Sequence, residues 1–179
     1  DMGVDFTAFP ASVQALLDRG QLGRKAGGGF YRMVKHDDGS KTMETYDLKT
    51  NDWRQAEKVE LDEAHATKEG LFVDDAEGRF AWAMTSSVLS YAADLVGDIA
   101  GDIVNIDRAM RWGFAWEKGP FEMIDALGAE RMAERLKAEG RHIPKMLQVL
   151  ADAGAATFYQ KEGSEYLGLD GAYHPTPAE

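Results

Sequence analysis

Hydrophobic residues recur three or four positions apart over several stretches of the chain, a spacing typical of amphipathic helices. The first stretch carries Val13, Leu16 and Leu17 and is followed by Gly20, the type of residue that commonly ends a helix. The longest stretch is expected to form the main core helix of a helical domain, through Phe80, Met84, Val88, Tyr91 and Leu95. Further helices are predicted at Asn105–Trp112 (ended by Gly113), Pro120–Leu127 (ended by Gly128), Ala129–Glu139 (ended by Gly140) and Pro144–Asp152 (ended by Gly154).

Between the first helix and the core helix, the pattern becomes typical of β-strands. A glycine-rich turn at 23–29 leads into aromatic and branched residues at 30–35, a turn at 37–40 reverses the chain, and a second strand follows at 41–47. Short strands are also expected near Trp53 and Phe158.

These elements predict a mainly α fold, a helical bundle with a small antiparallel β-hairpin near the N-terminus. The polar stretch from Gln55 to Thr67 divides the chain into residues 1–60 and a helical domain at 61–179.

One pattern occurs twice in the chain. P-x3-Q-x-L-x-D-x-G begins at Pro10 and again at Pro144, and each copy is followed by a Phe-Tyr pair, at 30–31 and 158–159. Two short helices can match by chance, but the shared order and the shared sequel favour an internal duplication. In this interpretation the first copy lacks counterparts of the helices between Phe80 and Glu139, so the chain is expected to begin inside a domain.

Composition excludes several classes of protein. The formal net charge of −11 disfavours binding to nucleic-acid phosphates, and the absence of cysteine excludes disulfides and thiolate metal ligands. No stretch has the roughly 18 consecutive apolar residues of a membrane span, and the first residues lack the layout of a signal peptide. With 179 residues, 44% of them hydrophobic, the chain is expected to fold as one or two domains in the cytoplasm.

Residue types that commonly carry catalysis or bind metals show no functional spacing. The four histidines are scattered, which indicates surface or turn positions and no metal site; they are His36, His65, His142 and His174. The glycines at 23–29 lack the Lys-Ser/Thr of a P-loop and precede a strand, whereas a dinucleotide fingerprint follows a strand and opens a helix. A structural turn is expected there, with phosphate contacts by Arg24 and Lys25 as the alternative.

Aromatic residues and glycines are concentrated at 105–128. Two tryptophans and two phenylalanines fall in this short span, and Gly113 and Gly119 are predicted to let two backbones approach closely. The residues alone therefore predict a crowded helix–loop–helix corner with a structural role.

This span strongly resembles the C-terminal domain of the 3-hydroxyacyl-CoA dehydrogenases, in which a helix of the form I-D-x-A-M-x-x-G precedes an aromatic loop, G-P-F and a second helix with an acidic residue before its glycine stop. The residues from Gly20 to Tyr31 are similar to the family's G-x-x-G-x-K-x-G-x-G-F-Y, with Ala26 where the family usually has threonine. The motif residues that the resemblance transfers, all structural, are Gly23, Lys25, Gly29, Phe30, Tyr31, Asp107, Gly113, Gly119, Pro120, Phe121 and Asp125.

The resemblance implies a parent enzyme that oxidises an L-3-hydroxyacyl-CoA with NAD in fatty-acid β-oxidation. In that family the Rossmann domain and the catalytic His and Glu lie upstream of these helices, so no catalytic, cofactor-binding or metal residue is assigned here, and no NAD is expected to bind. The resemblance further implies a multifunctional parent with an enoyl-CoA hydratase domain, and pairing of helical domains within one chain or in a homodimer.

The part of the parent represented here is expected to provide packing support, part of the wall beside the acyl-CoA, and contacts between domains, without activity of its own. The alternative is a non-enzymatic helical module that binds a partner protein through exposed apolar faces.

Overall fold

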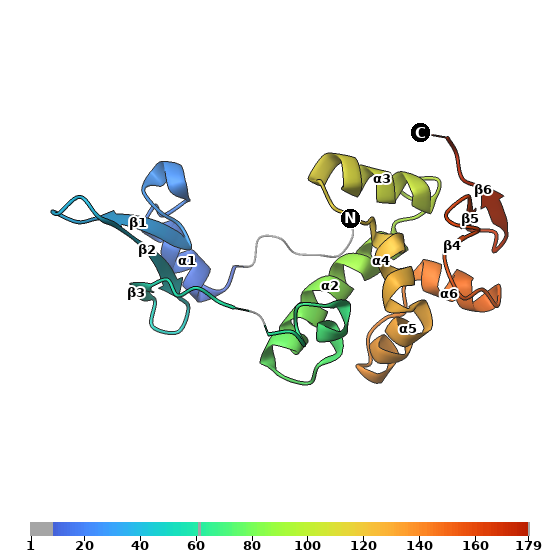
Figure 1. Cartoon of the computed structure of the whole chain (residues 1–179), viewed down its shortest axis with the longest axis horizontal. Coiled ribbons are helices and arrows are strands. Elements are labelled where there is room, and N and C mark those ends of the chain that lie inside the picture. Colours follow the sequence, from blue (N-terminus) through green and yellow to red (C-terminus); the bar gives the residue numbers. More distant parts are fainter. Residues whose placement is uncertain (1–8, 61, 179) are drawn as a thin grey trace. The chain divides into compact units, whose positions relative to one another are not determined.

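The computed structural model describes residues 9–60 and 62–178, which belong to two compact units, Asp1–Glu60 and Leu61–Glu179. In the described part of the chain, most of the helical residues lie in the second unit, and each unit contains one antiparallel sheet (Figure 1). The mainly α fold predicted from the sequence is confirmed.

The first unit contains a helix followed by a three-stranded antiparallel sheet (Figure 1). The helix α1 spans Ala11–Asp18, the 3-10 helix η1 spans Arg24–Ala26, and the strands, paired in sequence order, are β1 (Tyr31–Lys35), β2 (Lys41–Asp47) and β3 (Asp52–Gln55). The predicted hairpin is thus part of a sheet whose third strand lies near Trp53, as expected. Tyr46 is buried and packs edge to face on Trp53, with 5.3 Å between ring centroids.

The second unit is built around the long helix α2 (Ala76–Asp94), which contacts α4 and α6. The other elements, described from residue 62 to 178, are η2 (Lys68–Phe72), α3 (Ile103–Phe114), α4 (Pro120–Leu127), α5 (Ala129–Ala138), α6 (Lys145–Asp152), β4 (Tyr159–Gln160), β5 (Glu165–Leu167) and β6 (Tyr173–Pro175). The three strands form an antiparallel sheet in sequence order, and its first strand lies near Phe158, where a short strand was expected.

The face that α2 turns toward the core is not the predicted one. The expected core stripe is largely exposed, with 69% of Phe80 and 57% of Met84 accessible to solvent. The buried positions are spaced in the same helical way on another face, and they are Trp82, Ser86, Leu89, Ala92 and Ala93. The prediction was wrong because α2 carries apolar residues on two faces, and helical spacing alone does not say which face meets α4 and α6.

The ends of α3 also differ from those predicted. Asp102, not Asn105, caps the helix, and its Oδ1 accepts the backbone N–H of Asn105 at 2.8 Å. Gly113 lies inside the helix, which continues to Phe114 and ends at Ala115 in the left-handed conformation, with φ of 56°. The helix therefore begins before Asn105, the predicted start, because an aspartate is also a preferred N-cap residue.

The two segments that share a sequence pattern have the same local structure. Each begins after a proline, ends at a glycine with positive φ (69° at Gly20 and 62° at Gly154), and continues into a three-stranded antiparallel sheet. The residue after each glycine donates its N–H back to a buried leucine carbonyl, from Gln21 to Leu16 at 2.9 Å and from Ala155 to Leu150 at 3.0 Å. Figure 1 shows α1 beside its sheet in one unit and α6 preceding β4 in the other.

Candidate functional site

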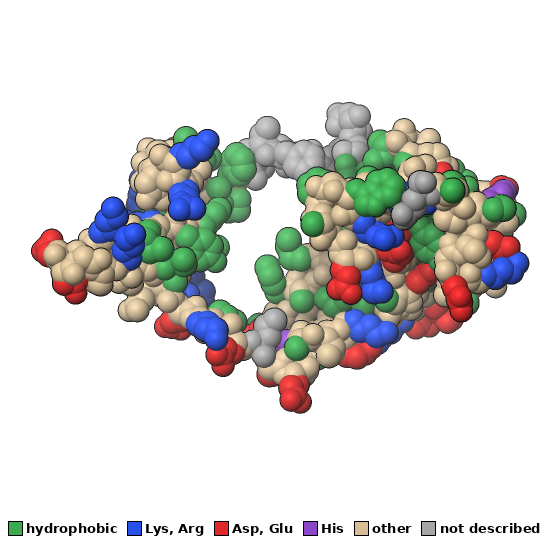
Figure 2. Space-filling model, turned by 45° about the horizontal axis from the view of Figure 1, so that its top comes forward, with side chains coloured by type: hydrophobic (Ala, Val, Ile, Leu, Met, Phe, Trp, Pro, Cys, Tyr) green, Lys and Arg blue, Asp and Glu red, His purple; other side chains and the backbone are tan. Residues whose placement is uncertain are grey.

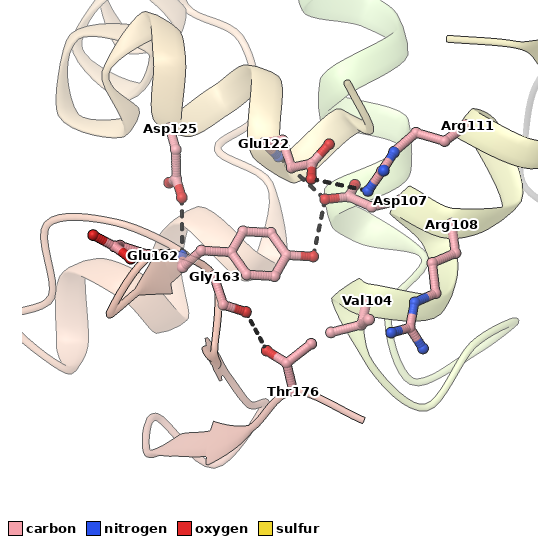
Figure 3. Close-up of a pocket in the computed structure, with 10 residues that line it drawn as sticks. Val104, Asp107, Arg108, Arg111, Glu122, Asp125, Glu162, Gly163 and Thr176 are labelled. Atoms are coloured by element: carbon pink, nitrogen blue, oxygen red, sulfur yellow. Dashed lines mark hydrogen bonds and ion pairs between the residues drawn. The ribbon is translucent and has the colours of Figure 1, made fainter. Parts of the chain in front are cut away.

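The corner between α3 and α4 is held by the carboxylate of Asp107, which is 2% exposed. Asp107 projects from α3 toward the N-terminus of α4 (Figure 3). There its Oδ1 accepts the N–H of Phe121 at 2.8 Å and its Oδ2 accepts that of Glu122 at 3.2 Å. The first N–H groups of a helix have no partner within the helix and carry partial positive charge. Asp107 therefore caps α4 from another helix.

Close contact between the two helices requires glycine at position 119. A Cβ added to Gly119 would lie 2.3 Å from Cβ and Cγ of Asp107 and 2.4 Å from its Cα. The N–H of Gly119 donates to Oε2 of Glu122 at 2.7 Å, and Pro120 supplies the first residue of α4, where a proline needs no donor. The motif Gly119-Pro120-Phe121 thus starts α4 against the side chain of Asp107.

A second carboxylate, Asp125 on α4, binds the strand that follows α6. Its Oδ1 accepts the N–H of Phe158 at 2.7 Å, and its Oδ2 accepts the N–H of Tyr159 at 2.9 Å. Phe158 is fully buried and packs edge to face on Phe121, with 5.0 Å between centroids. The hydroxyl of Tyr159 donates to Oδ2 of Asp107 at 3.0 Å, so both carboxylates bind Tyr159.

Burial controls the electrostatics of this cluster. It raises the pKa of Asp107 to about 7, against the opposing effect of the hydrogen bonds from Phe121, Tyr159 and Glu122. Burial likewise raises the pKa of Asp125 to about 6, and it raises the pKa of Tyr159 well above its usual value, with the charge of Asp107 as a further cause. A low-dielectric environment disfavours the charged form of each group.

The cluster borders a pocket of about 440 Å³ (Figure 3). Arg111 reaches Oε1 of Glu122 at 3.3 Å in this pocket, while Arg108 donates to the backbone carbonyl oxygens of Pro177 and Ala178. The carboxylate oxygens of Asp107 and Asp125 accept hydrogen bonds from donors of the same chain. The arrangement is therefore suited to holding the α3–α4 corner and the β4 strand together.

The motif residues of the first unit form their own turn. Gly23 and Gly28 exchange backbone hydrogen bonds of 2.8 and 3.1 Å, and a Cβ on Gly29 would lie 3.0 Å from the Cα of Gly23. Lys25 is exposed within η1. Phe30 and Tyr31, which follow the turn, are 49% and 63% exposed.

Two partners of this site were missed by the sequence analysis. Phe158 and Tyr159 were recognised as a repeated pair, but nothing linked them to carboxylates more than thirty positions earlier.

The expectation that Gly113 permits a close approach is wrong, because no atom lies within 4 Å of a Cβ placed there. A glycine in a sequence does not reveal whether its missing side chain makes room for a neighbour.

Other candidate chemistry is sparse in the described ranges. His65 lies 2.6 Å from Asp62 and 2.9 Å from Asp75, and hydrogen bonds to these two carboxylates raise its pKa. Within residues 9–60 and 62–178, no group of three or more His, Cys, Asp or Glu side chains is placed to hold a metal ion. No helix in these ranges is long and apolar enough to cross a membrane.

The glycine-rich turn does not have the arrangement of a dinucleotide-phosphate site. The Gly23–Gly29 turn leads into β1, and both sheets are antiparallel meanders, whereas a dinucleotide phosphate is bound where a parallel strand enters a helix.

The fold and the corner define a class of protein, a helical domain in which two buried aspartates fasten one helix and one strand. Comparison of the amino-acid sequence with curated proteins identifies its relatives. The chain is 38% identical over 172 residues to a Bacillus subtilis protein named as a 3-hydroxyacyl-CoA dehydrogenase, a match that covers 90% of this chain and 21% of that protein. It is 28% identical over 133 residues to a Rickettsia felis protein named as a trifunctional enzyme of a fatty acid oxidation complex, covering 74% of this chain and 18% of the relative.

The chain is thus related to proteins named as 3-hydroxyacyl-CoA dehydrogenases and fatty acid oxidation trifunctional enzymes, and the resemblance stated from its motifs is confirmed. It spans about a fifth of the length of these curated relatives. No protein-family model and no solved structure matches it.

Proposed function

We propose that the chain is a C-terminal portion of an NAD-dependent L-3-hydroxyacyl-CoA dehydrogenase of fatty-acid β-oxidation, where it supports the acyl-CoA-side packing and the contacts between domains. The observation that carries this proposal is the match to the Bacillus subtilis protein over 172 residues. The hydrogen-bonded corner of Asp107, Gly119 and Asp125 supports it, because the motif of the dehydrogenase family falls on the residues that hold the domain together.

In this proposal the hydride acceptor and the general base belong to other parts of the parent enzyme. The 179-residue chain should therefore reduce no NAD with a short L-3-hydroxyacyl-CoA, followed by NADH absorbance at 340 nm. A polypeptide extended upstream to include a Rossmann domain should reduce NAD with the same substrate. Activity of the short chain alone, or an upstream reading frame without a dinucleotide-binding domain, would contradict the proposal.

We also propose that residues 1–60 are the last part of a first helical domain and that residues 61–179 form a second copy of it. The matching local structures after Pro10 and Pro144 support a duplication. The parent would then resemble the multifunctional enzymes of fatty-acid oxidation, with an enoyl-CoA hydratase domain, a cytoplasmic location and helical domains that pair within the chain or between two copies.

A helical module that binds a partner protein is the second candidate. It is favoured by large apolar side chains exposed on the second unit, namely Phe80, Met84, Trp112 and Phe114. The two candidates differ in what is encoded upstream of Asp1. A dinucleotide-binding domain there supports the dehydrogenase, and an unrelated domain supports the interaction module.

A further inference from the structure

The two Phe-Tyr pairs of the chain occupy matching positions in their sheets. Tyr31 faces Thr45 across β1 and β2, as Tyr159 faces Tyr166 across β4 and β5. The carbonyl oxygen of Phe30 accepts the N–H of Tyr46 at 2.9 Å, and that of Phe158 accepts the N–H of Leu167 at 2.8 Å. The two pairs therefore stand at the same register relative to the neighbouring strand.

The two pairs differ in their partners, because carboxylates bind the second pair and none in the described part of the chain binds the first. Asp125 accepts both N–H groups of Phe158 and Tyr159, and Asp107 accepts the Tyr159 hydroxyl. Among the described residues, the N–H of Phe30 has no acceptor. Tyr31 and Thr45 form the non-hydrogen-bonded kind of antiparallel pair, so the N–H of Tyr31 also points to the open edge. A half-exposed apolar ring and two backbone donors without an acceptor among the described residues thus lie next to each other in the sequence.

We propose that the Phe30–Tyr31 edge is a docking surface for a helix–loop–helix corner that carries two carboxylates, located in the polypeptide of the parent outside these 179 residues. One carboxylate accepts the N–H groups of Phe30 and Tyr31, and the other accepts the Tyr31 hydroxyl. The ring of Phe30 packs on an apolar residue at the start of the second helix. This inference rests on the proposed function, because a duplicated dehydrogenase domain is the source of such a corner.

The first unit is far less acidic than the second. Residues 1–60 hold nine Lys and Arg against ten Asp and Glu, whereas residues 61–179 hold eleven against 21. A pocket of about 560 Å³ beside Tyr31 is lined by basic and apolar side chains, which are Arg24, Arg32, Lys41, Met33 and Met43. Figure 2 shows Lys and Arg side chains beside hydrophobic ones on this unit. A basic and apolar rim is complementary to a corner with buried carboxylates.

The corner of a second copy of this chain does not serve as the partner. In each copy Asp107 and Asp125 are already engaged by Phe158 and Tyr159. The length of the relatives supplies the alternative, because the match over 172 residues covers 21% of the Bacillus subtilis protein. The remaining polypeptide of such a parent has ample room for a second corner of the same kind.

Amide hydrogen exchange, compared between the 179-residue chain and the upstream-extended parent, tests this docking surface. The amides of Phe30 and Tyr31 should exchange at least about 100-fold more slowly in the parent, because a buried hydrogen bond to a carboxylate replaces one to water. The amides of Phe158 and Tyr159 are the matched control and should exchange equally slowly in both proteins. Unchanged exchange at Phe30 and Tyr31 would overturn the inference.

Substitution of the two tyrosines gives a second readout. Tyr31→Phe should leave the melting temperature of the short chain unchanged and lower that of the parent by about 2–4 °C. Tyr159→Phe should lower it in both proteins. Dehydrogenase activity of the parent separates the two proposals. If the parent is active and Tyr31→Phe leaves its melting temperature unchanged, the docking surface alone is refuted. If the parent is inactive, the proposed function is refuted.

Discussion

Asp107 and Asp125 each bind two consecutive backbone N–H groups of a segment that is distant in sequence. Each carboxylate satisfies donors that would otherwise be buried without a partner, a situation that costs about 1–3 kcal/mol for each group. Burial has a consequence of its own, because it makes the charged form of Asp107 less favourable in the folded state. The stability of the corner therefore depends on pH.

The substitution Asp107→Asn should make the protein less sensitive to pH. The folded pKa of Asp107 is about 7, whereas an exposed aspartate titrates near 3.9. Between these values the folded state keeps a proton that the unfolded chain has lost, so the free energy of unfolding falls as the pH rises from about 4 to 7. Urea unfolding should show that the free energy of unfolding falls between pH 5 and pH 8 by about 2 kcal/mol more in the unsubstituted 179-residue chain than in the variant.

The other buried aspartate, Asp125, affects both proteins of this experiment equally. Asp125, with a pKa of about 6, is present in both proteins and contributes the same slope to each. Equal losses of stability in the two proteins would mean that the three hydrogen bonds keep Asp107 ionised at pH 5.

Two glycines of the same motif should respond oppositely to alanine. Gly119→Ala forces a methyl group into the backbone and side chain of Asp107 and should cost about 2–3 kcal/mol. Gly113→Ala places a methyl group in open space inside α3 and should be neutral or stabilise by up to about 1 kcal/mol. Thermal unfolding followed by circular dichroism measures both. Similar effects of the two substitutions would show that Asp107 does not lie against Gly119.

Element types were easier to predict than their contacts. The helices from Pro120 to Asp152 and the strands β1 to β3 follow from local signals, since prolines, glycines and turn residues mark their ends. The buried face of α2 did not follow, because it depends on where α4 and α6 lie. The bonds from Asp125 to Phe158 and Tyr159 did not follow either, since they join residues 33 and 34 positions apart.

Neighbouring leucines of α1 provide a test at the level of the element. Leu16 is 3% exposed and Leu17 is 36% exposed. Leu16→Glu should therefore unfold the first unit, because it buries a charge among apolar groups, while Leu17→Glu should leave its melting temperature within about 1 °C. If Leu17→Glu instead lowers the melting temperature or reduces the sedimentation coefficient, Leu17 is buried between copies of the chain, as expected for paired helical domains.

At the scale of the whole molecule, the hydrophobic core is distributed very unequally. Of the buried hydrophobic residues in the described ranges, Leu16 and Tyr46 belong to the first unit, and all the others belong to the second. A segment of this length with so small a core is marginally stable at best. A summed composition hides the difference, which is why 44% hydrophobic content predicted folded domains without indicating that one of them has a much smaller core.

Unfolding should consequently occur in two steps in the 179-residue chain. In a urea titration followed by NMR, the amide of Tyr46 should lose its native signal at a lower concentration than that of Leu136, which is fully buried in the second unit. Trp53→Ala, which removes the aromatic partner of Tyr46, should lower the first midpoint and leave the second unchanged. If the Phe30–Tyr31 edge is covered in the upstream-extended parent, as we propose, the first midpoint should rise toward the second there. Coincident midpoints in the short chain would show that the two units already stabilise each other without any further polypeptide.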